Sequence, residues 1–538
     1  MLGYKHGFPE KESTYGPAKR GEVFWGSQLQ CQGDEESLED CRGKENPSCT
    51  RGEVAGVTCF LGGMLLFRTQ LKFDSIVADE ENQPATTTTT KTTTITTTSS
   101  TTTTTTTTLP SMAKKEIVKK IGGAEICRYS DKPNALAFAA KLLTDTIAEF
   151  AQSIYLHMAE KNENGNFVFS PLGLHSALTM LYLATTAKST STQELFSAIR
   201  GWANMLCSYK SVIDDYSREK SFRYGNKFWL QKGQDINANF QQKIHEILHS
   251  DAENIDFSAE DSVDLVNAWV ASITNGKITK MVKEFSRNTV LYLANALYFK
   301  EEWLVPFEDV NYDETPLRGS FETPAGSKDV PMIQQINYNA TYREVKIFGD
   351  NEFVEVLSLP YKNDLFEMQI ILPSSKKHLS IIETKMKLSY ERDLNDNQEG
   401  YYNIFSLKKD DILDELKEDV SEVYLRLPTF QLRSDLDVVD SLKKLGAKKV
   451  FESGAELAEL GAGQLSVSKI SHSALVEVTK EGTEGAAATG AEIVLLSSAL
   501  NDRLDIVVDR PFIFVVQDKK NKIPVLVGRV MDPTVKIP

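Results

Sequence analysis

The stretch from His472 to Gly490, HSALVEVTKEGTEGAAATG, decides how this chain is interpreted. Its first part, HSALVEV, alternates in a way that predicts a strand. A run of small residues follows, and about 20 further residues separate it from RPFIFVV. Small side chains contribute little packing to a fixed strand, but they suit a segment that slides between two existing strands without clashes. The pattern therefore predicts a loop that can enter a sheet.

Side chains alternate between the two faces of a strand, so an inserted loop would have an inner and an outer face. Glu484 would then point away from the interior, toward solvent. In isolation, a flexible surface loop rich in Gly and Ala remains the alternative. The expected inner face consists of Thr483, Gly485, Ala487, Thr489 and Ala491.

The bulk composition limits the possible functions. With 538 residues, two or three domains are expected. The formal net charge of −15 argues against nucleic acid as a main partner, because phosphate binding needs a basic face. No run approaches the roughly 20 apolar residues of a transmembrane helix, so no transmembrane segment is expected. The first 20 residues are polar and charged, so no signal peptide is visible.

The chain divides into three regions, which we place at residues 1–60, 61–110 and 111–538. The first region holds four cysteines within 29 residues, a density typical of disulfides in an oxidising compartment. Their spacing is too wide for a CxxC metal knuckle. The second region contains a run of almost pure threonine at 86–108, which cannot offset its ordering entropy. It predicts a disordered linker, either a stalk with O-linked sugars or an unmodified spacer.

The third region has a globular pattern. Apolar residues recur at helical spacing over Ile147–Met158 and again over Val263–Ile273, with Gly276 placed to end the second helix. Strand-like runs lie at Val290–Phe299 and Met368–Pro373. Two more, RPFIFVV and PVLVGRV, flank a polar turn and predict a hairpin. Helices gather early and strands late, which predicts the α+β class.

Ordered motifs over some 400 residues resemble the serpin family of protease inhibitors. They are NFVFSPLGL from Asn166, NAWVASITNGKI from Asn267, LANALYFKEEWLVPFE from Leu293, LSLPYK from Leu357, LPTFQL from Leu427 and the closing DRPFIFVVQDKKNKIPVLVGRVMDP. The resemblance implies three sheets, about nine helices and an exposed reactive centre loop. It also implies suicide inhibition. A serine protease cleaves the loop, becomes acylated, and is trapped when the loop inserts into the central sheet. Such an inhibitor is not an enzyme, needs no cofactor, and is expected to be a monomer.

Individual family residues carry over by position. The resemblance places Asn295, His472, Ser170 and Trp303 where the sheet opens, although a lone histidine can also be a satisfied core residue. Gly173 replaces the usual serine of this cluster, so one hydrogen bond is expected to be missing. Lys480 stands where the family has glutamate, so the ion pair there should be missing or reversed. The hinge itself is expected to comprise Gly482, Thr483, Glu484, Gly485, Ala486, Ala487, Ala488 and Thr489.

The resemblance also places the scissile bond, about 14 residues beyond Gly482. That count gives Leu496–Ser497. A leucine before the bond favours chymotrypsin- or elastase-like proteases with an apolar primary pocket. Leu495 and Leu500 remain alternatives, and Arg503 would instead suit a trypsin-like enzyme.

The sequence also contains HEILH at His245–His249, a formal HExxH. On a helix this pattern would put two imidazoles and a glutamate in position to bind zinc. No third ligand follows at a suitable spacing, so we expect a solvated helix face and no metal.

The first 60 residues resemble the second half of a scavenger receptor cysteine-rich domain, through LGYKHG, VFWGSQLQCQGDEESLEDC and GEVAGVTC. The resemblance pairs Cys31 with Cys41 and leaves Cys49 and Cys59 without their partners. The chain therefore seems to start in mid-domain, which would also explain the missing signal peptide. A disordered remnant with free thiols is the alternative.

Features of the third region point to a secreted protein. By resemblance to plasma members of the family, we expect a Cys127–Cys207 disulfide. Asn339 opens an Asn-Ala-Thr glycosylation sequon. Four lysines suggest either a sulfated-glycan site or a solvated linker face. They are Lys114, Lys115, Lys119 and Lys120. The segment from Lys387 to Asp411 has no strong periodicity and is expected to be a surface insertion.

The sequence thus predicts an extracellular inhibitor of serine proteases. The alternative is a serpin-fold binding or carrier protein without inhibitory function, with the cysteine-rich part as its recognition module. Small hinge residues favour the inhibitor, because non-inhibitory members tend to carry bulky or charged residues there.

Overall fold

The structure is a computed structural model with two units, Met1–Thr108 and Leu109–Pro538, each considered separately. In the second unit it describes residues 133–201, 205–219, 221–311, 313–346, 353–374, 379–396, 403–405, 422–461, 465–483 and 503–535, together with strands β3 (Val118–Ile121) and β4 (Ala124–Cys127). In the first unit it describes strands β1 (His6–Glu10) and β2 (Gly56–Phe60), which pair antiparallel.

Eight α-helices lie in the described part of the second unit. They are α3 (Pro133–Lys161), α4 (Pro171–Ala184), α5 (Thr190–Ala198), α6 (Met205–Tyr216), α7 (Ala238–Leu248), α8 (Ser262–Ile273), α9 (Leu379–Asp396) and α10 (Val439–Lys444), and a short 3-10 helix, η3, covers Lys449–Phe451. The predicted helical stripes over Ile147–Met158 and Val263–Ile273 are confirmed as parts of α3 and α8. Gly276 has a positive φ of 79°, and its N–H donates to the Ala271 carbonyl at 2.7 Å, so it helps to end α8.

The largest sheet has seven strands. It follows the order β7 (Asp251–Ile255), β6 (Phe222–Gln231), β8 (Leu291–Phe299), β17 (Lys469–Val478), β18 (Gly482–Thr483), β9 (Glu301–Glu302), and β16 (Phe430–Asp437) also pairs with β17. In its middle, β8 and β17 run parallel and pair directly from Tyr292–Lys469 to Leu297–Ala474. We call this seven-stranded sheet the central sheet.

Two further sheets complete the body, which confirms the expected three-sheet α+β architecture. The six-stranded sheet contains β12 (Thr341–Lys346), β13 (Phe353–Pro360), β14 (Phe366–Pro373), β20 (Phe512–Asp518), β21 (Pro524–Val530) and β5 (Phe167–Phe169). The four-stranded sheet contains β10 (Arg318–Thr323), β11 (Gly326–Asn337), β15 (Glu422–Pro428) and β19 (Arg503–Val507). The predicted C-terminal hairpin is confirmed, because β20 and β21 pair antiparallel.

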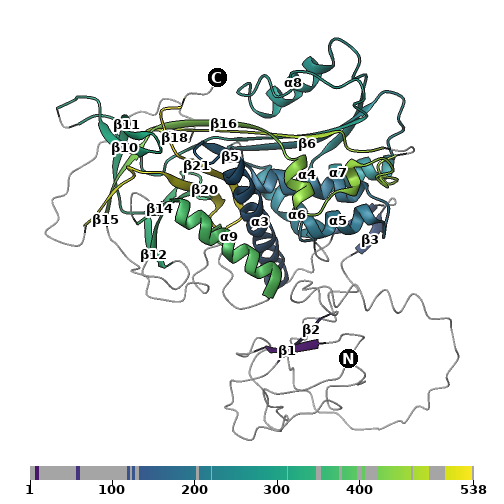
Figure 1. The fold of residues 1–538 in the computed structure, drawn as a ribbon, viewed down its shortest axis with the longest axis horizontal. Helices are drawn as coiled ribbons and strands as arrows, with labels where there is room; N and C mark the ends of the chain where they lie inside the picture. Colours follow the sequence, from purple (N-terminus) through teal and green to yellow (C-terminus); the bar gives the residue numbers. More distant parts are fainter. Residues whose placement is uncertain are drawn as a thin grey trace, which may run out of the picture. The chain divides into compact units, whose positions relative to one another are not determined.

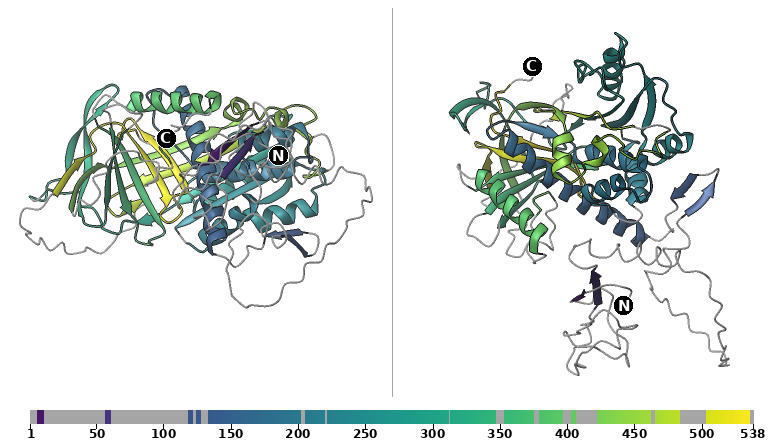
Figure 2. Two further views of the ribbon diagram at one scale, coloured as in Figure 1. Left: turned by 90° about the horizontal axis from the view of Figure 1, so that it is seen from below. Right: turned by 45° about the vertical axis from the view of Figure 1, so that its right-hand side comes forward.

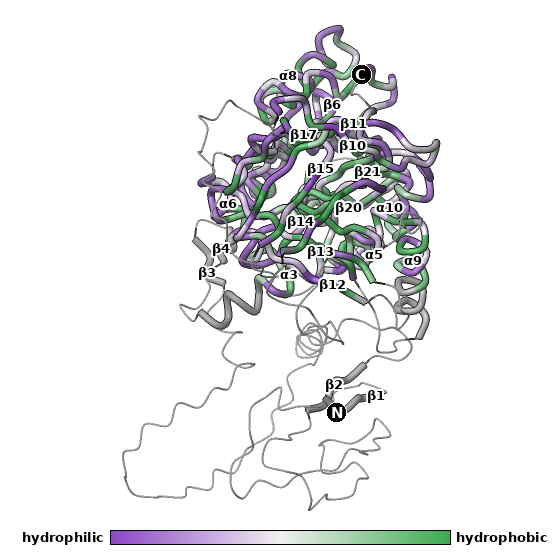
Figure 3. The backbone as a smooth tube through the Cα atoms, turned by 90° about the vertical axis from the view of Figure 1, so that its left-hand side faces the viewer, coloured by the Kyte–Doolittle hydropathy of each residue, from purple (hydrophilic) through white to green (hydrophobic). Residues whose placement is uncertain are grey.

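Helices cover both faces of the central sheet. Helix α8 lies on one side of it, where Val266 and Val270 pack against strands β6 and β8 (Figure 1). On the other side, α4 packs against β6, β8 and β21, and α3 runs beneath it (Figures 1 and 2). Hydrophobic residues follow β14 and β20 through the middle of the molecule, as Figure 3 shows. All seven residues of β20 are buried, so the hairpin is a core element.

The segment expected to be an aperiodic insertion begins as helix. Helix α9 continues to Asp396, so the expectation was wrong for the part from Lys387 to that residue. Beyond it, residues 403–405 are buried, and the Phe405 ring centroid lies 5.5 Å from that of Tyr155 on α3. An aromatic contact therefore holds this short piece against the core, which the sequence pattern did not indicate.

Candidate functional site: the hinge and the strands that must part

The start of the small-residue stretch is already a strand of the central sheet. Thr483 pairs with Val478 of β17 on one side and with Glu301 of β9 on the other, and Gly482 pairs with Glu302. All these pairings are antiparallel. Strand β18 therefore lies between β17 and β9, which is where an inserted loop strand would begin.

Hydrogen bonds hold the turn that precedes β18. The carbonyls of Thr479, Lys480 and Glu481 each accept one bond. Trp303 donates from Nε1 to the first at 3.0 Å and from its backbone N–H to the third at 3.0 Å. The backbone N–H of Phe307 donates to the second at 2.9 Å. Trp303, which was expected at the entry to the sheet, is thus bonded directly to the turn.

Tyr361 anchors the strand itself. Its hydroxyl lies 2.5 Å from Thr483 Oγ1, and both side chains are fully buried. The tyrosine ring stacks on Trp303, with centroids 4.7 Å apart and planes 10° apart, and meets Phe299 edge-on at 5.2 Å. Burial raises the pKa of Tyr361, so its hydroxyl keeps its proton. The Thr483 side chain therefore points into the core, as the face assignment expected.

Gly482 occupies a position with no room for a side chain. A Cβ there would lie 2.1 Å from the Glu301 carbonyl oxygen and 2.8 Å from Glu302 Cα. Both are backbone atoms of a paired strand, so they cannot swing away. Glycine is required here by close backbone approach.

Lys480 forms an ion pair at the foot of the hinge. Its Nζ lies 3.0 Å from Asp309 Oδ1, with about two-fifths to half of each side chain exposed. Of the two outcomes expected from the lysine, a missing or a reversed pair, the structure has a pair with the cation on the loop side. Because it is exposed, this pair contributes little stability, at most about 1 kcal/mol.

The buried cluster beneath the sheet centres on His472 and Asn295. They are register partners across the parallel pair β17–β8. The backbone N–H of Ser170 donates to His472 Nε2 at 2.9 Å, so the ring proton must be on Nδ1, which donates to Asn295 Oδ1 at 2.5 Å. Burial lowers the pKa of His472 to about 3, so the ring is neutral near pH 7.

The amide of Asn295 continues the network into α4 and β6. Its Nδ2 donates to the Gly173 carbonyl at 3.1 Å and to Asn226 Oδ1 at 2.5 Å. Asn226 in turn donates to Ser176 Oγ at 3.0 Å. Ser170 Oγ accepts from the Gly173 N–H at 2.9 Å and caps α4, so it does not bond the two partners directly.

Gly173 changes the packing of this cluster as well as its hydrogen bonds. A Cβ at this position would lie 2.9 Å from Asn295 Oδ1 and 3.0 Å from Ser170 Oγ. The Asn295 amide thus occupies the space that a side chain would need. Replacing Gly173 by serine would push Asn295 away from its present contacts.

Several predicted residues lie outside the described part of the structure. They are Glu484, Gly485, Ala486, Ala487, Ala488, Thr489, Leu496, Ser497, Cys31 and Cys41. For the remaining cysteines, Cys207 on α6 is disulfide-bonded, and β4, which ends at Cys127, packs against α6 and α7. Asn339 is exposed in the bend between β11 and β12. Its exposure is compatible with modification.

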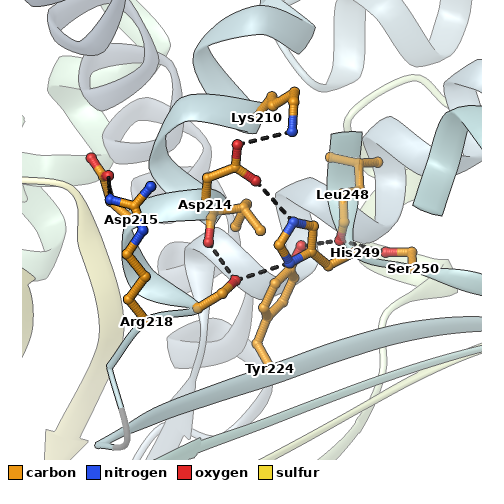
Figure 4. A network of polar contacts seen from close by, with 10 residues as sticks. Lys210, Asp214, Asp215, Arg218, Tyr224, Leu248, His249 and Ser250 are labelled. Atoms are coloured by element: carbon orange, nitrogen blue, oxygen red, sulfur yellow. Dashed lines mark hydrogen bonds and ion pairs between the residues drawn. The ribbon is translucent and has the colours of Figure 1, made fainter. Parts of the chain in front are cut away.

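The HExxH pattern does not form a single helix face. His245 lies near the end of α7, 3.5 Å from Asp251, whereas His249 caps the helix with a left-handed φ of 46°. His249 Nε2 lies 2.9 Å from Asp214 of α6, as Figure 4 shows (Figure 4). The two imidazoles therefore face different carboxylates. In the described part of the chain, no group of three His, Cys, Asp or Glu side chains is arranged to hold a metal.

Sequence reasoning missed two contributors to the site. Tyr361 lies within LSLPYK, which marked the family but gave no role to the tyrosine. Asn226 lies in the middle of β6, where a polar residue on a buried strand was the available signal. No described helix is long and apolar enough to cross a membrane.

This geometry defines a class of protein: one whose central sheet has a ready site for one more strand and a loop that already enters it. A family model described as Serpin (serine protease inhibitor) matches residues 145–533, and the chain belongs to the serpin family. Members of the family are protease inhibitors rather than enzymes. The model of the scavenger receptor cysteine-rich domain matches residues 1–60.

Individual relatives are distant but are matched over almost their whole length. Neuroserpin of Gallus gallus is 29% identical over 412 residues, which cover 74% of this chain and 93% of that protein. The leukocyte elastase inhibitor of Bos taurus is 28% identical over 402 residues, covering 71% and 97%. Among solved structures, Serpin48 of the insect Tenebrio molitor has a TM-score of 0.59 at 25% identity, covering 75% of this chain and 100% of that one. A thyroxine-binding globulin complex with thyroxine, at 21% identity, shares the fold with a TM-score of 0.59.

Proposed function

We propose that this chain is a secreted inhibitor of serine proteases that acts by loop cleavage, covalent trapping and insertion of the loop into the central sheet. The observation that carries the proposal is the position of β18 between β17 and β9. Inhibitory relatives such as neuroserpin and the leukocyte elastase inhibitor support it at the level of the family.

The register supports continued insertion. Val478 lies six residues beyond His472, and Glu301 lies six residues beyond Asn295. The strands that flank Thr483 are therefore in the same register as the pair that touches below it. A loop strand can extend between them without any slip of β17 against β8.

The size of the hinge residues fits the space they would enter. Continuing from Thr483, Gly485 would lie between Val476 and Phe299, and Ala487 between Ala474 and Leu297. These four flanking residues are at most 2% exposed. Large or charged side chains would not fit this face, whereas glycine and alanine do.

The same register brings a hydroxyl to the polar cluster. Thr489 lies six residues beyond Thr483, so it would arrive between His472 and Asn295. A strand that enters there must break the bond between His472 Nδ1 and Asn295 Oδ1. A threonine hydroxyl can accept from one and donate to the other, so the buried groups would regain partners. On the opposite face, Glu484 would come beside half-buried Lys300.

The target is proposed to be a serine protease with an apolar primary pocket, cleaving at Leu496–Ser497. Secretion is proposed from the cysteine-rich match at residues 1–60, the threonine-rich stretch and the disulfide-bonded Cys207. The packing of β4 on α6 supports Cys127 as the partner of Cys207. A sulfated-glycan partner and a monomeric state remain predictions.

The test is incubation of the purified full-length chain with chymotrypsin-, elastase- and trypsin-like proteases. We expect a covalent complex that survives SDS with an enzyme of the first two groups. Mass spectrometry of the released C-terminal peptide would give its first residue, Ser497 if the count is right. Clean loop cleavage by every protease without a complex would contradict inhibition and favour the carrier alternative.

A further inference from the structure

Two contacts fix the position of β18 along the strands that flank it. We propose that Gly482 and Tyr361 are positioning residues that hold β18 in the one register from which the loop continues as a central strand. This inference rests on the proposed function, because a register matters only if the loop inserts. The support comes from the described residues at the top of the central sheet.

Gly482 excludes neighbouring registers by its size. A slip of one or two residues would place Lys480, Glu481, Thr483 or Glu484 beside the backbone of Glu301. Each has a Cβ, which would fall 2.1 Å from the carbonyl oxygen of that residue. The next glycine, Gly485, is three residues away, and an odd shift would turn every following side chain to the opposite face.

Tyr361 selects the same register by hydrogen bonding. Its ring is fixed by the stack on Trp303 and the edge contact with Phe299, so the hydroxyl has a fixed position. A slip of one residue would put Gly482 or Glu484 opposite it, and a slip of two would put Glu481 or Gly485 there. None of these has a hydroxyl. Because the phenol is fully buried, such a slip replaces a hydroxyl pair at 2.5 Å by an unpaired group or a buried carboxylate.

The two constraints are independent, since one is steric and comes from β9 while the other is polar and follows β13. They act on adjacent residues of the same two-residue strand. Trp303 links them, because it stacks on Tyr361 and bonds the turn before Gly482. Loop insertion would therefore start from an aligned end rather than search for its register.

The test compares two tyrosines that each lose one buried hydrogen bond. Tyr361→Phe removes the bond to Thr483 and keeps the aromatic stack. Tyr216→Phe is the matched control, because its hydroxyl is fully buried and bonds Asp518 at 2.7 Å, away from the hinge. Loss of a typical hydrogen bond predicts about fivefold faster hydrogen exchange over Thr479–Thr483 in the first variant only.

The functional readout is the ratio of cleaved inhibitor to covalent complex. Tyr361→Phe should raise this ratio, by up to about fivefold, because fewer loops start from the aligned position. Thr483→Val should do the same, and Thr483→Ser should not. Unchanged exchange in Tyr361→Phe, or faster exchange with an unchanged ratio, would overturn the inference.

Failure of the proposed function gives a different result. If the wild-type chain forms no complex with any protease, that function fails. The rate at which loop cleavage raises the unfolding temperature then replaces the ratio as readout. A slower rise in Tyr361→Phe than in Tyr216→Phe supports the positioning role, and equal rates contradict it.

Discussion

Replacing Thr483 by arginine is a direct test of loop insertion. The wild-type side chain has no exposed surface and its Oγ1 meets the Tyr361 hydroxyl. Arginine would either carry a charge into this aromatic site or keep the hinge out of the sheet. An uncompensated buried charge costs about 3–5 kcal/mol, which corresponds to insertion slowed roughly 10²- to 10⁴-fold. Cleavage should be unaffected, because the scissile bond lies elsewhere on the loop. The variant should therefore become a substrate.

The assay is titration of the protease with the variant, followed by SDS gel analysis and recovery of protease activity. We expect nearly all of Thr483→Arg to appear as cleaved chain, with activity restored once it is consumed. Thr483→Ser is the control, since it keeps the hydroxyl and should still form complex. Equal complex formation by the wild type and the arginine variant would refute the reasoning, because a charge at this position cannot enter the sheet without cost.

Three further predictions concern stability and covalent structure. Burial lowers the pKa of His472 to about 3 and of His175 to about 4, so the unfolded chain binds protons more readily. Stability should be full above pH 6.5 and fall as the pH drops toward these values, by about 2 kcal/mol per histidine at pH 5. Urea unfolding at pH 7.5 and 5.0 measures this, and equal midpoints would contradict it. A non-reducing peptide map should contain a Cys127–Cys207 linked pair, and separate peptides would exclude that pairing. Expression through a secretory pathway should add a sugar at Asn339, seen as a mass shift that Asn339→Gln abolishes.

Local patterns predicted the elements that build the site. Alternation and apolar runs predicted β8 and β17, and helical periodicity predicted α3 and α8. These patterns are reliable because each reflects burial of one face of a regular element. The small hinge residues could also be interpreted from sequence, because the limit on side-chain size at a buried position is set by packing.

Contacts between distant segments could not be predicted in the same way. Tyr361 and Thr483 are 122 positions apart, and no periodicity within either segment indicates that their hydroxyls meet. The HExxH pattern shows the converse problem, because its spacing assumes a continuous helix. His249 leaves the helix in a left-handed conformation and turns to Asp214 instead. Tertiary pairing decided both cases.

The parallel pairing of β8 and β17 has a consequence for the driving force of insertion. These strands run in the same direction, so one strand entering between them is antiparallel to both, as β18 already is to β17 and β9. Insertion would exchange one parallel ladder for two antiparallel ladders, which are slightly more stable per residue and provide about twice the backbone hydrogen bonds. Strand polarity alone thus makes the gap between β8 and β17 an unfinished ladder, so the closed sheet would be the higher-energy arrangement once a free loop end is available.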